Sequence, residues 1–114
     1  MNTLRWAREH TLLSLTERTA DGISNIINAG EYSSALFFIT ASVVTGADAT
    51  LKATLQMSPD NETWFDSEYK ISDLTLASKQ ILAVPALGRY VRFNYTIEGT
   101  DPHVTFNIVG AFKS

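Results

Sequence analysis

The stretch TLKATLQMSPDNETW, residues 50–64, decides the fold class of this chain. Its first half alternates strictly between polar residues and the apolar residues Leu51, Ala53, Leu55 and Met57. Side chains on a β-strand point to opposite faces at every second residue, so the pattern predicts a strand with one buried and one solvated face. Pro59, Asp60 and Asn61 then favour a turn, and Trp64 follows where it can fold back over the same sheet. We therefore expect a β-hairpin whose apolar face contributes to a sandwich core.

The segment before this hairpin is the most apolar of the chain. Residues 35–44 read ALFFITASVV, an almost continuous apolar run. Such a run predicts a central strand that is buried on much of both faces. Residues 45–48 (TGAD) are typical of a turn, which we expect to lead into the strand that begins near Thr50.

The segment after the hairpin closes the predicted sandwich. Pro85 and Gly88 end an ambiguous stretch, residues 75–84, that fits neither the helical nor the strand period. A strong alternating strand follows, and residues 99–102 (GTDP) predict a turn into a last strand that runs to Phe112. We expect these two strands to direct the following side chains into the core: Val91, Phe93, Tyr95, Ile97, Val104, Phe106, Ile108 and Phe112.

Weaker strand patterns occupy the remaining segments. Residues 11–16 (TLLSLT) predict a first strand with Leu13 and Leu15 on one face, residues 23–27 a short second strand, and residues 65–69 a short return strand. Short strands separated by Gly, Pro, Asn and Asp indicate an all-β fold. We expect one antiparallel β-sandwich, jelly-roll-like, over residues 11–114, preceded by a short N-terminal arm over residues 1–10.

Composition limits the functions that fit the chain. With 114 residues, 45% hydrophobic and 18% charged, the chain is long enough for one domain with its own core. Its net charge of −3 argues against a nucleic-acid partner, and the absence of cysteine excludes disulfides and thiol chemistry. No apolar run approaches the roughly 20 residues of a membrane helix, and no Sec-type leader is recognisable. We expect neither a membrane partner nor Sec export.

The chemistry-bearing residues predict no metal, no cofactor and no enzymatic site. His10 and His103 stand alone, without carboxylates at ligand spacing. The acidic residues Asp60, Glu62, Asp66 and Glu68 lack the spacing and central glycine of a calcium loop, so a solvated hairpin end is the better interpretation. The glycines stand singly, which leaves no phosphate-binding loop.

Two groups of exposed residues remain as binding candidates. The N-terminal arm holds Leu4, Arg5, Trp6 and Arg8, and is either a loosely ordered chain end or an arm that docks on a neighbouring subunit, since an exposed Trp favours a cover. Trp64, Tyr69 and Tyr90 form either a carbohydrate platform or plugs at the ends of the sandwich. Both alternatives stay open for each group.

Three pieces of the chain together resemble a pattern common in small proteins of tailed bacteriophages and prophages. They are YSSAL (32–36) before an apolar strand, LQMSPD (55–60) with Trp64 shortly after, and GRYVRF (88–93) followed by IEGT (97–100). The resemblance covers residues 11–112. The usual SPDG form of the hairpin is SPDN here, a small departure because Asn also tolerates left-handed geometry.

This resemblance implies a β-sandwich structural protein of the virion, such as a capsid decoration (cement) protein or another small head or tail component. The implied partner is the major capsid protein or another virion protein, bound by homo-oligomers or by copies that the lattice places. On exposure arguments we predict the assembly interface at Leu4, Arg5, Trp6, Arg8, Asp60, Asn61 and Phe65. The piece GRYVRF is also similar to the late strand of discoidin-type, galactose-binding-like domains, which implies the alternative of a sugar- or surface-binding module that uses Trp64, Tyr69 and Tyr90.

Overall fold

The structure, a computed structural model, describes residues 8–114 and consists of β-strands joined by turns and loops. Within this range there is no helix, and so none that could cross a membrane. The all-β prediction is confirmed. The strands in chain order are β1 (Arg8–Arg18), β2 (Gly22–Ile23), β3 (Ile27–Asn28), β4 (Ser34–Ser58), β5 (Phe65–Lys70), β6 (Ser78–Val84) and β7 (Tyr90–Lys113).

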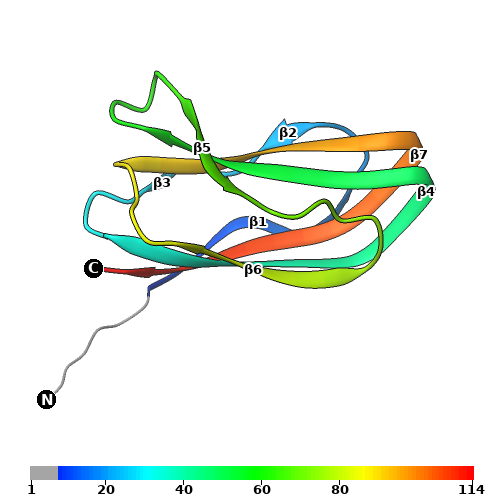
Figure 1. Cartoon of the computed structure of the whole chain (residues 1–114), viewed down its shortest axis with the longest axis horizontal. Coiled ribbons are helices and arrows are strands. Elements are labelled where there is room, and N and C mark those ends of the chain that lie inside the picture. Colours follow the sequence, from blue (N-terminus) through cyan, green and yellow to red (C-terminus); the bar gives the residue numbers. More distant parts are fainter. Residues whose placement is uncertain (1–7) are drawn as a thin grey trace, which may run out of the picture.

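Two long strands, β4 and β7, build both layers of the molecule. They pair antiparallel over nearly their whole length, from Ser34 opposite Lys113 to Ser58 opposite Tyr90. Figure 1 shows that both strands bend back together, so that one half of each lies in an upper layer and the other half in a lower layer. The upper layer adds β2, β3 and β5, and the lower layer adds β1 and β6. This arrangement is an antiparallel β-sandwich, as the sequence predicted.

The bend between the layers depends on left-handed backbone positions. The β4–β7 register shifts between Thr45 and Ala47 and again between Ala47 and Thr50, and positive φ angles occur in this region at Gly46 of β4 (φ 113°) and Gly99 of β7 (φ 122°). A Cβ at Gly99 would lie 2.8 Å from the Ala49 Cα, so the site requires glycine. The two predicted turns, 45–48 and 99–102, are therefore bends inside continuous strands.

The core fills the space between the layers with alternate side chains of the same two strands. All eight predicted inward residues of β7 are buried, together with Phe37, Ile39, Leu51 and Leu55 of β4. The Phe37 ring in the lower layer meets the Phe93 ring of the upper layer edge to face, with their centroids 5.0 Å apart. Such T-shaped pairs are a favoured aromatic geometry, so this contact joins the two sheets directly.

Two predictions about the short strands are wrong. Leu13 and Leu15 do not share a face: Leu12 and Leu13 are both buried and Leu15 is exposed, because register shifts flank Leu13 in the β1–β7 pairing. The single strand over 23–27 is instead two short strands, β2 and β3. Between them the buried Ser24 hydroxyl accepts a hydrogen bond from the Phe93 backbone N–H (2.8 Å), which replaces the missing ladder bond.

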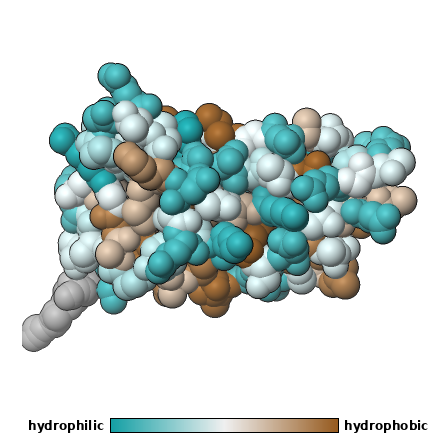
Figure 2. Space-filling model, turned by 45° about the horizontal axis from the view of Figure 1, so that its top comes forward, coloured by the Kyte–Doolittle hydropathy of each residue, from teal (hydrophilic) through white to brown (hydrophobic). Residues whose placement is uncertain are grey.

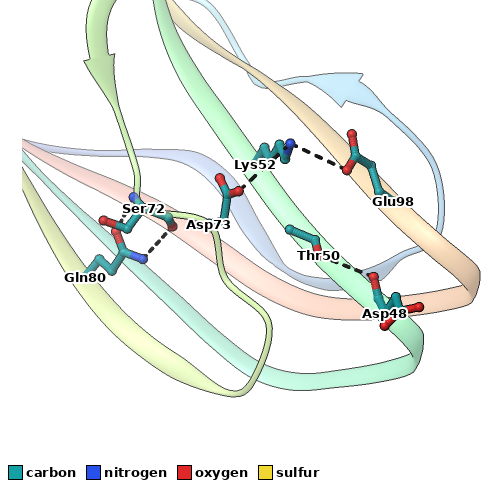
Figure 3. A network of polar contacts seen from close by, with 7 residues as sticks. All are labelled: Asp48, Thr50, Lys52, Ser72, Asp73, Gln80 and Glu98. Atoms are coloured by element: carbon teal, nitrogen blue, oxygen red, sulfur yellow. Dashed lines mark hydrogen bonds and ion pairs between the residues drawn. The ribbon is translucent and has the colours of Figure 1, made fainter.

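The remaining segments complete the edges of the sheets. The return strand predicted over 65–69 is confirmed as β5, and the ambiguous stretch contains β6. Figure 3 shows the Gln80 amide of β6 bonded to both backbone groups of Ser72, at 3.0 Å and 2.8 Å. Residues 8–10, placed in the arm by the sequence analysis, pair with β7 as the start of β1. The rest of the arm lies outside the described residues.

Candidate functional site

The outer face of the lower sheet is an exposed apolar surface. Leu36 and Phe38 of β4 point away from the core, and Leu36 lies between Ala83 of β6 and Ala111 of β7 in the strand register. Phe38 lies between Ile81 and Val109 in the same way. Phe38 is 38% exposed and Ile81 is 65% exposed. We name this surface the lower outer face; its residues are Leu36, Phe38, Ile81, Ala83, Val109 and Ala111.

This surface corrects one prediction. The apolar run 35–44 predicted a strand buried on much of both faces, but the described chain covers only its inner face. An antiparallel strand with one solvated face normally alternates between apolar and polar residues. Residues 51–58 of the same strand obey that rule and residues 35–39 do not. The composition of this half of β4 is therefore that of a strand covered on both sides.

Two shallow grooves hollow the lower outer face. The first has a volume of about 400 Å³ and the second about 440 Å³. Leu36, Ala83, Pro85 and Ala111 contribute to the first groove, with Lys113 beside them, and Phe38, Ile81 and Lys79 contribute to the second. Each groove thus combines an apolar floor with one lysine, and no carboxylate is among the described residues that line them.

The outer face of the upper sheet is polar instead. Arg92 of β7 lies over the ring of Trp64, 4.1 Å from the ring centroid, and its Nε donates a hydrogen bond to the Gln56 Oε1 (2.8 Å). The Gln56 amide in turn donates to the Asp66 carboxylate (2.8 Å). Figure 2, turned toward this layer, shows mostly hydrophilic atoms, with the hydrophobic ones in small separate groups. These polar side chains thus pair with one another.

An ion-pair group continues this polar surface toward the bend. Figure 3 shows Lys52 of β4 between the carboxylates of Asp73 and Glu98, with nitrogen–oxygen distances of 3.9 Å and 3.6 Å. All three side chains are about half exposed, so solvent screens the pairs and their contribution to stability is small.

The hairpin end after β4 is a self-contained hydrogen-bonded turn. The buried Ser58 hydroxyl accepts from the backbone N–H of Asn61 (2.8 Å), and the Asp60 carboxylate accepts from those of Thr63 (2.8 Å) and Glu62 (2.9 Å). These backbone donors hold the pKa of Asp60 below its ordinary value. Asn61 adopts the left-handed conformation (φ 64°) that the sequence allowed for. The Asp60 oxygens are thus engaged by their own turn, and residues 8–114 contain no group of three potential metal ligands.

The predicted assembly residues lie in two places. Asp60, Asn61 and Phe65 lie together at the hairpin end, all exposed, and Phe65 is 58% exposed where it begins β5. Arg8 lies at the start of β1 in the lower layer and is exposed as well. Leu4, Arg5 and Trp6 lie outside the described residues. Their role as an interface stays a prediction.

The aromatic residues of the alternative platform do not form one surface. Tyr69 packs against the hydrophobic core, whereas Trp64 covers Arg92 on the upper outer face. Tyr90 is half-buried at the start of β7, with the Arg89 guanidinium 5.4 Å from its ring centroid. The structure therefore separates Tyr69 from the other two.

Two further features escaped the sequence analysis. One is a polar hollow at the end of the sandwich, to which Asn28, Glu31 and Arg89 contribute; no motif marks it, because its residues come from two distant loops. The other is the surroundings of the two histidines. His10 packs edge to face against Phe112, and His103 lies within 3.3 Å of a Glu17 carboxylate oxygen and 3.5 Å of one from Asp101.

Comparison with known proteins finds likeness in fold. No protein-family model and no curated protein sequence matches the chain. The crystal structure of the SPBc2 prophage-derived protein YomS superposes with a TM-score of 0.62 at 10% identity, over 100% of this chain and 98% of that one. A family two carbohydrate esterase from Cellvibrio japonicus gives a TM-score of 0.38 at 9% identity, over 97% of this chain and 35% of that one, which is too low to support an argument. The chain thus shares its whole fold with a prophage-derived protein.

Proposed function

We propose that this chain is a structural protein of a tailed-phage or prophage particle, and that it decorates the capsid. The observation that carries the proposal is the fold match with a prophage-derived protein, which leaves almost no part of either chain unmatched. The three sequence pieces that resemble small virion proteins support it independently, because they are local sequence patterns and not features of the backbone fold. Because the two chains share 10% of their residues, the match itself shows a common fold alone.

In this role the protein acts by binding many equivalent sites. Each copy would contact the major capsid protein through modest interactions, and these add up over a symmetric shell. Bound copies stabilise the assembled shell because they bind it and not its dissociated subunits. The predicted assembly contacts are those of the N-terminal arm and the hairpin end: Leu4, Arg5, Trp6, Arg8, Asp60, Asn61 and Phe65.

We further propose that the protein works without catalysis or a cofactor. Three polar groups that could be considered for chemistry make structural contacts instead. His103 sits between two carboxylates, Asp60 holds its own turn, and Gln56 links Arg92 to Asp66.

Co-sedimentation of the purified chain with phage heads tests the proposal. We expect saturable binding, with a copy number that matches the shell symmetry. A variant that lacks residues 1–7 should keep its fold but no longer bind phage heads, whereas Trp64→Ala should still bind them. Absence of saturable binding to heads would contradict the capsid role, and binding that survives the deletion would contradict the role of the arm.

A further inference from the structure

The lower outer face is built like a surface that another element covers. Its central residues Leu36, Phe38 and Ile81 are side by side across β4 and β6 and are 43%, 38% and 65% exposed. An apolar group of this kind on a strand surface marks an interaction site or an aggregation hazard. β6 adds to the hazard, because it lies at the sheet edge and pairs only with β4 among the named strands. The question is which partner fits.

The charges beside the two grooves limit which kind of partner fits the lower outer face. Although the whole chain carries a net charge of −3, the described residues that line the two grooves contribute Lys79 and Lys113 and no acidic side chain. A partner that fits must therefore present an apolar group flanked by carboxylates.

The hairpin end of this same chain presents that combination. Phe65 is 58% exposed, although an aromatic side chain gains most from burial. Residues 60–68 carry four carboxylates, Asp60, Glu62, Asp66 and Glu68, and no lysine or arginine. Arg92 contacts this segment at Trp64, and its guanidinium is held between the Trp64 ring and Gln56. The hairpin end is thus an exposed aromatic ring in an acidic setting.

We propose that Phe65 of one copy inserts into the groove formed by Leu36, Ala83, Pro85 and Ala111 of a second copy. In this contact the Glu62 carboxylate of the first copy pairs with the Lys113 ammonium of the second. The ring covers the apolar floor, and the ion pair fixes the orientation of the hairpin. Because apolar burial and charge pairing act together, the contact is specific for a partner that offers both.

The two halves of this contact lie on different parts of the molecule, so one chain cannot satisfy its own groove. Phe65 begins β5, which lies in the upper layer, whereas β6 and the end of β7, which line the groove, lie in the lower layer (Figure 1). The contact is therefore heterologous, with different surfaces of the two copies facing each other. Repetition of such a contact produces a closed ring or an open filament. The contact does not depend on the proposed virion role, because it concerns the isolated chain.

Sedimentation velocity of the full chain over a concentration series tests this proposal. We expect species heavier than the monomer that grow with concentration and weaken at high salt, since salt screens the ion pair. Phe65→Ser and Ala83→Arg should each weaken association by about tenfold or more. Ile23→Ser is the matched control, because Ile23 is 52% exposed but lies on β2, at the opposite edge of the upper sheet.

A charge exchange between Lys113 and Glu62 distinguishes this contact from non-specific association. Lys113→Glu and Glu62→Lys should each weaken association, and the double variant should restore it. A chain that stays monomeric at every concentration would overturn the proposal. So would association that responds to Ala83→Arg but not to Phe65→Ser, because the face would then bind another surface. Circular dichroism of each variant verifies that the fold is intact.

Discussion

The two outer faces of this sandwich differ although the same two strands build them. On the lower sheet, β4 and β7 present Leu36, Phe38 and Val109, and on the upper sheet they present Lys52, Gln56 and Arg92. The strands change character at the bend, where Gly46 and Gly99 redirect them. Pairing between the strands does not by itself require an apolar outer face on one sheet or a polar outer face on the other. The upper outer face is suited to water and polar neighbours, and the lower outer face is the one for which we propose a second copy as partner.

The largest expected effect on stability comes from replacing an inward residue of the lower sheet, and an outward neighbour is the comparison. Phe37 is fully buried and Phe38, its neighbour in the chain, is exposed on the other side. Phe37→Ala should lower the free energy of unfolding by about 3–5 kcal/mol, because it removes transfer energy and leaves a cavity. Phe38→Ala should cost clearly less in the monomer, because it removes only cross-strand contacts worth roughly 0.2–1 kcal/mol each and leaves no enclosed cavity. Urea unfolding of both variants measures the contrast, and equal losses would show that Phe38 supports the fold rather than an interface.

The next effect concerns the bend that separates the two faces. Gly99 has φ 122°, and a Cβ there would lie 2.9 Å from the Ala47 carbonyl oxygen. Gly99→Ala should therefore destabilise the fold by about 1–3 kcal/mol, in the range of other strained backbone positions. The control is Gly30→Ala, whose nearest contact is the flexible Asn28 side chain at 3.2 Å. If Gly30→Ala lowered the unfolding temperature more than Gly99→Ala, the strict requirement for glycine at the bend would be contradicted.

A smaller effect is expected on the upper outer face. Arg92→Ala removes the stacking on Trp64 and the bond to Gln56, and should cost about 1 kcal/mol, since cation–π contacts at exposed sites are worth about 0.5–1 kcal/mol. Arg92→Lys should restore part of this loss. Neither change should alter self-association, which sedimentation would check. A change in oligomeric state would show that the upper face also takes part in the interface.

The smallest effect concerns the hairpin turn and its pH dependence. Backbone donors hold the pKa of Asp60 below its ordinary value of about 3.9, so its contribution to stability is present above that value and is lost as the pH falls through the lowered one. Asp60→Asn keeps an acceptor but removes the charge. The difference in stability between the two proteins should therefore be present at neutral pH and disappear in strong acid. A difference that is constant over the acidic range would contradict the charge-based role of Asp60.

The sequence predicted the parts of the fold that local patterns encode. Strict alternation in 51–57 and 91–97 identified the strands and their inward residues, and the Ser58–Asn61 turn followed from its residue types. The β1 register was missed because its irregularities follow from pairing with β7, which is remote in sequence. Glycine and aspartate favour both turns and bends, so the sequence predicts turns at 45–48 and 99–102 where the structure has bends inside β4 and β7.

The candidate surface was foreseen only in part. Phe65, Asp60 and Asn61 were chosen by exposure, and the structure places them together at the hairpin end. The groove residues Ala83, Pro85 and Ala111 were not chosen, since nothing in a single sequence shows that β6 and the end of β7 flank Leu36. One signal was present: the continuous apolar run 35–44 implied a cover on both faces of this strand.

The most direct test of the contrast between the two faces is hydroxyl-radical footprinting of the whole chain at low and high protein concentration. We predict that Leu36, Pro85 and Phe65 lose reactivity as concentration rises, because Phe65 of a second copy covers the groove that Leu36 and Pro85 line. Tyr90 and Ile23 should keep theirs. Reactivity that stays unchanged at all five residues, or that falls equally at all of them, would contradict the assignment of the lower outer face as an interface.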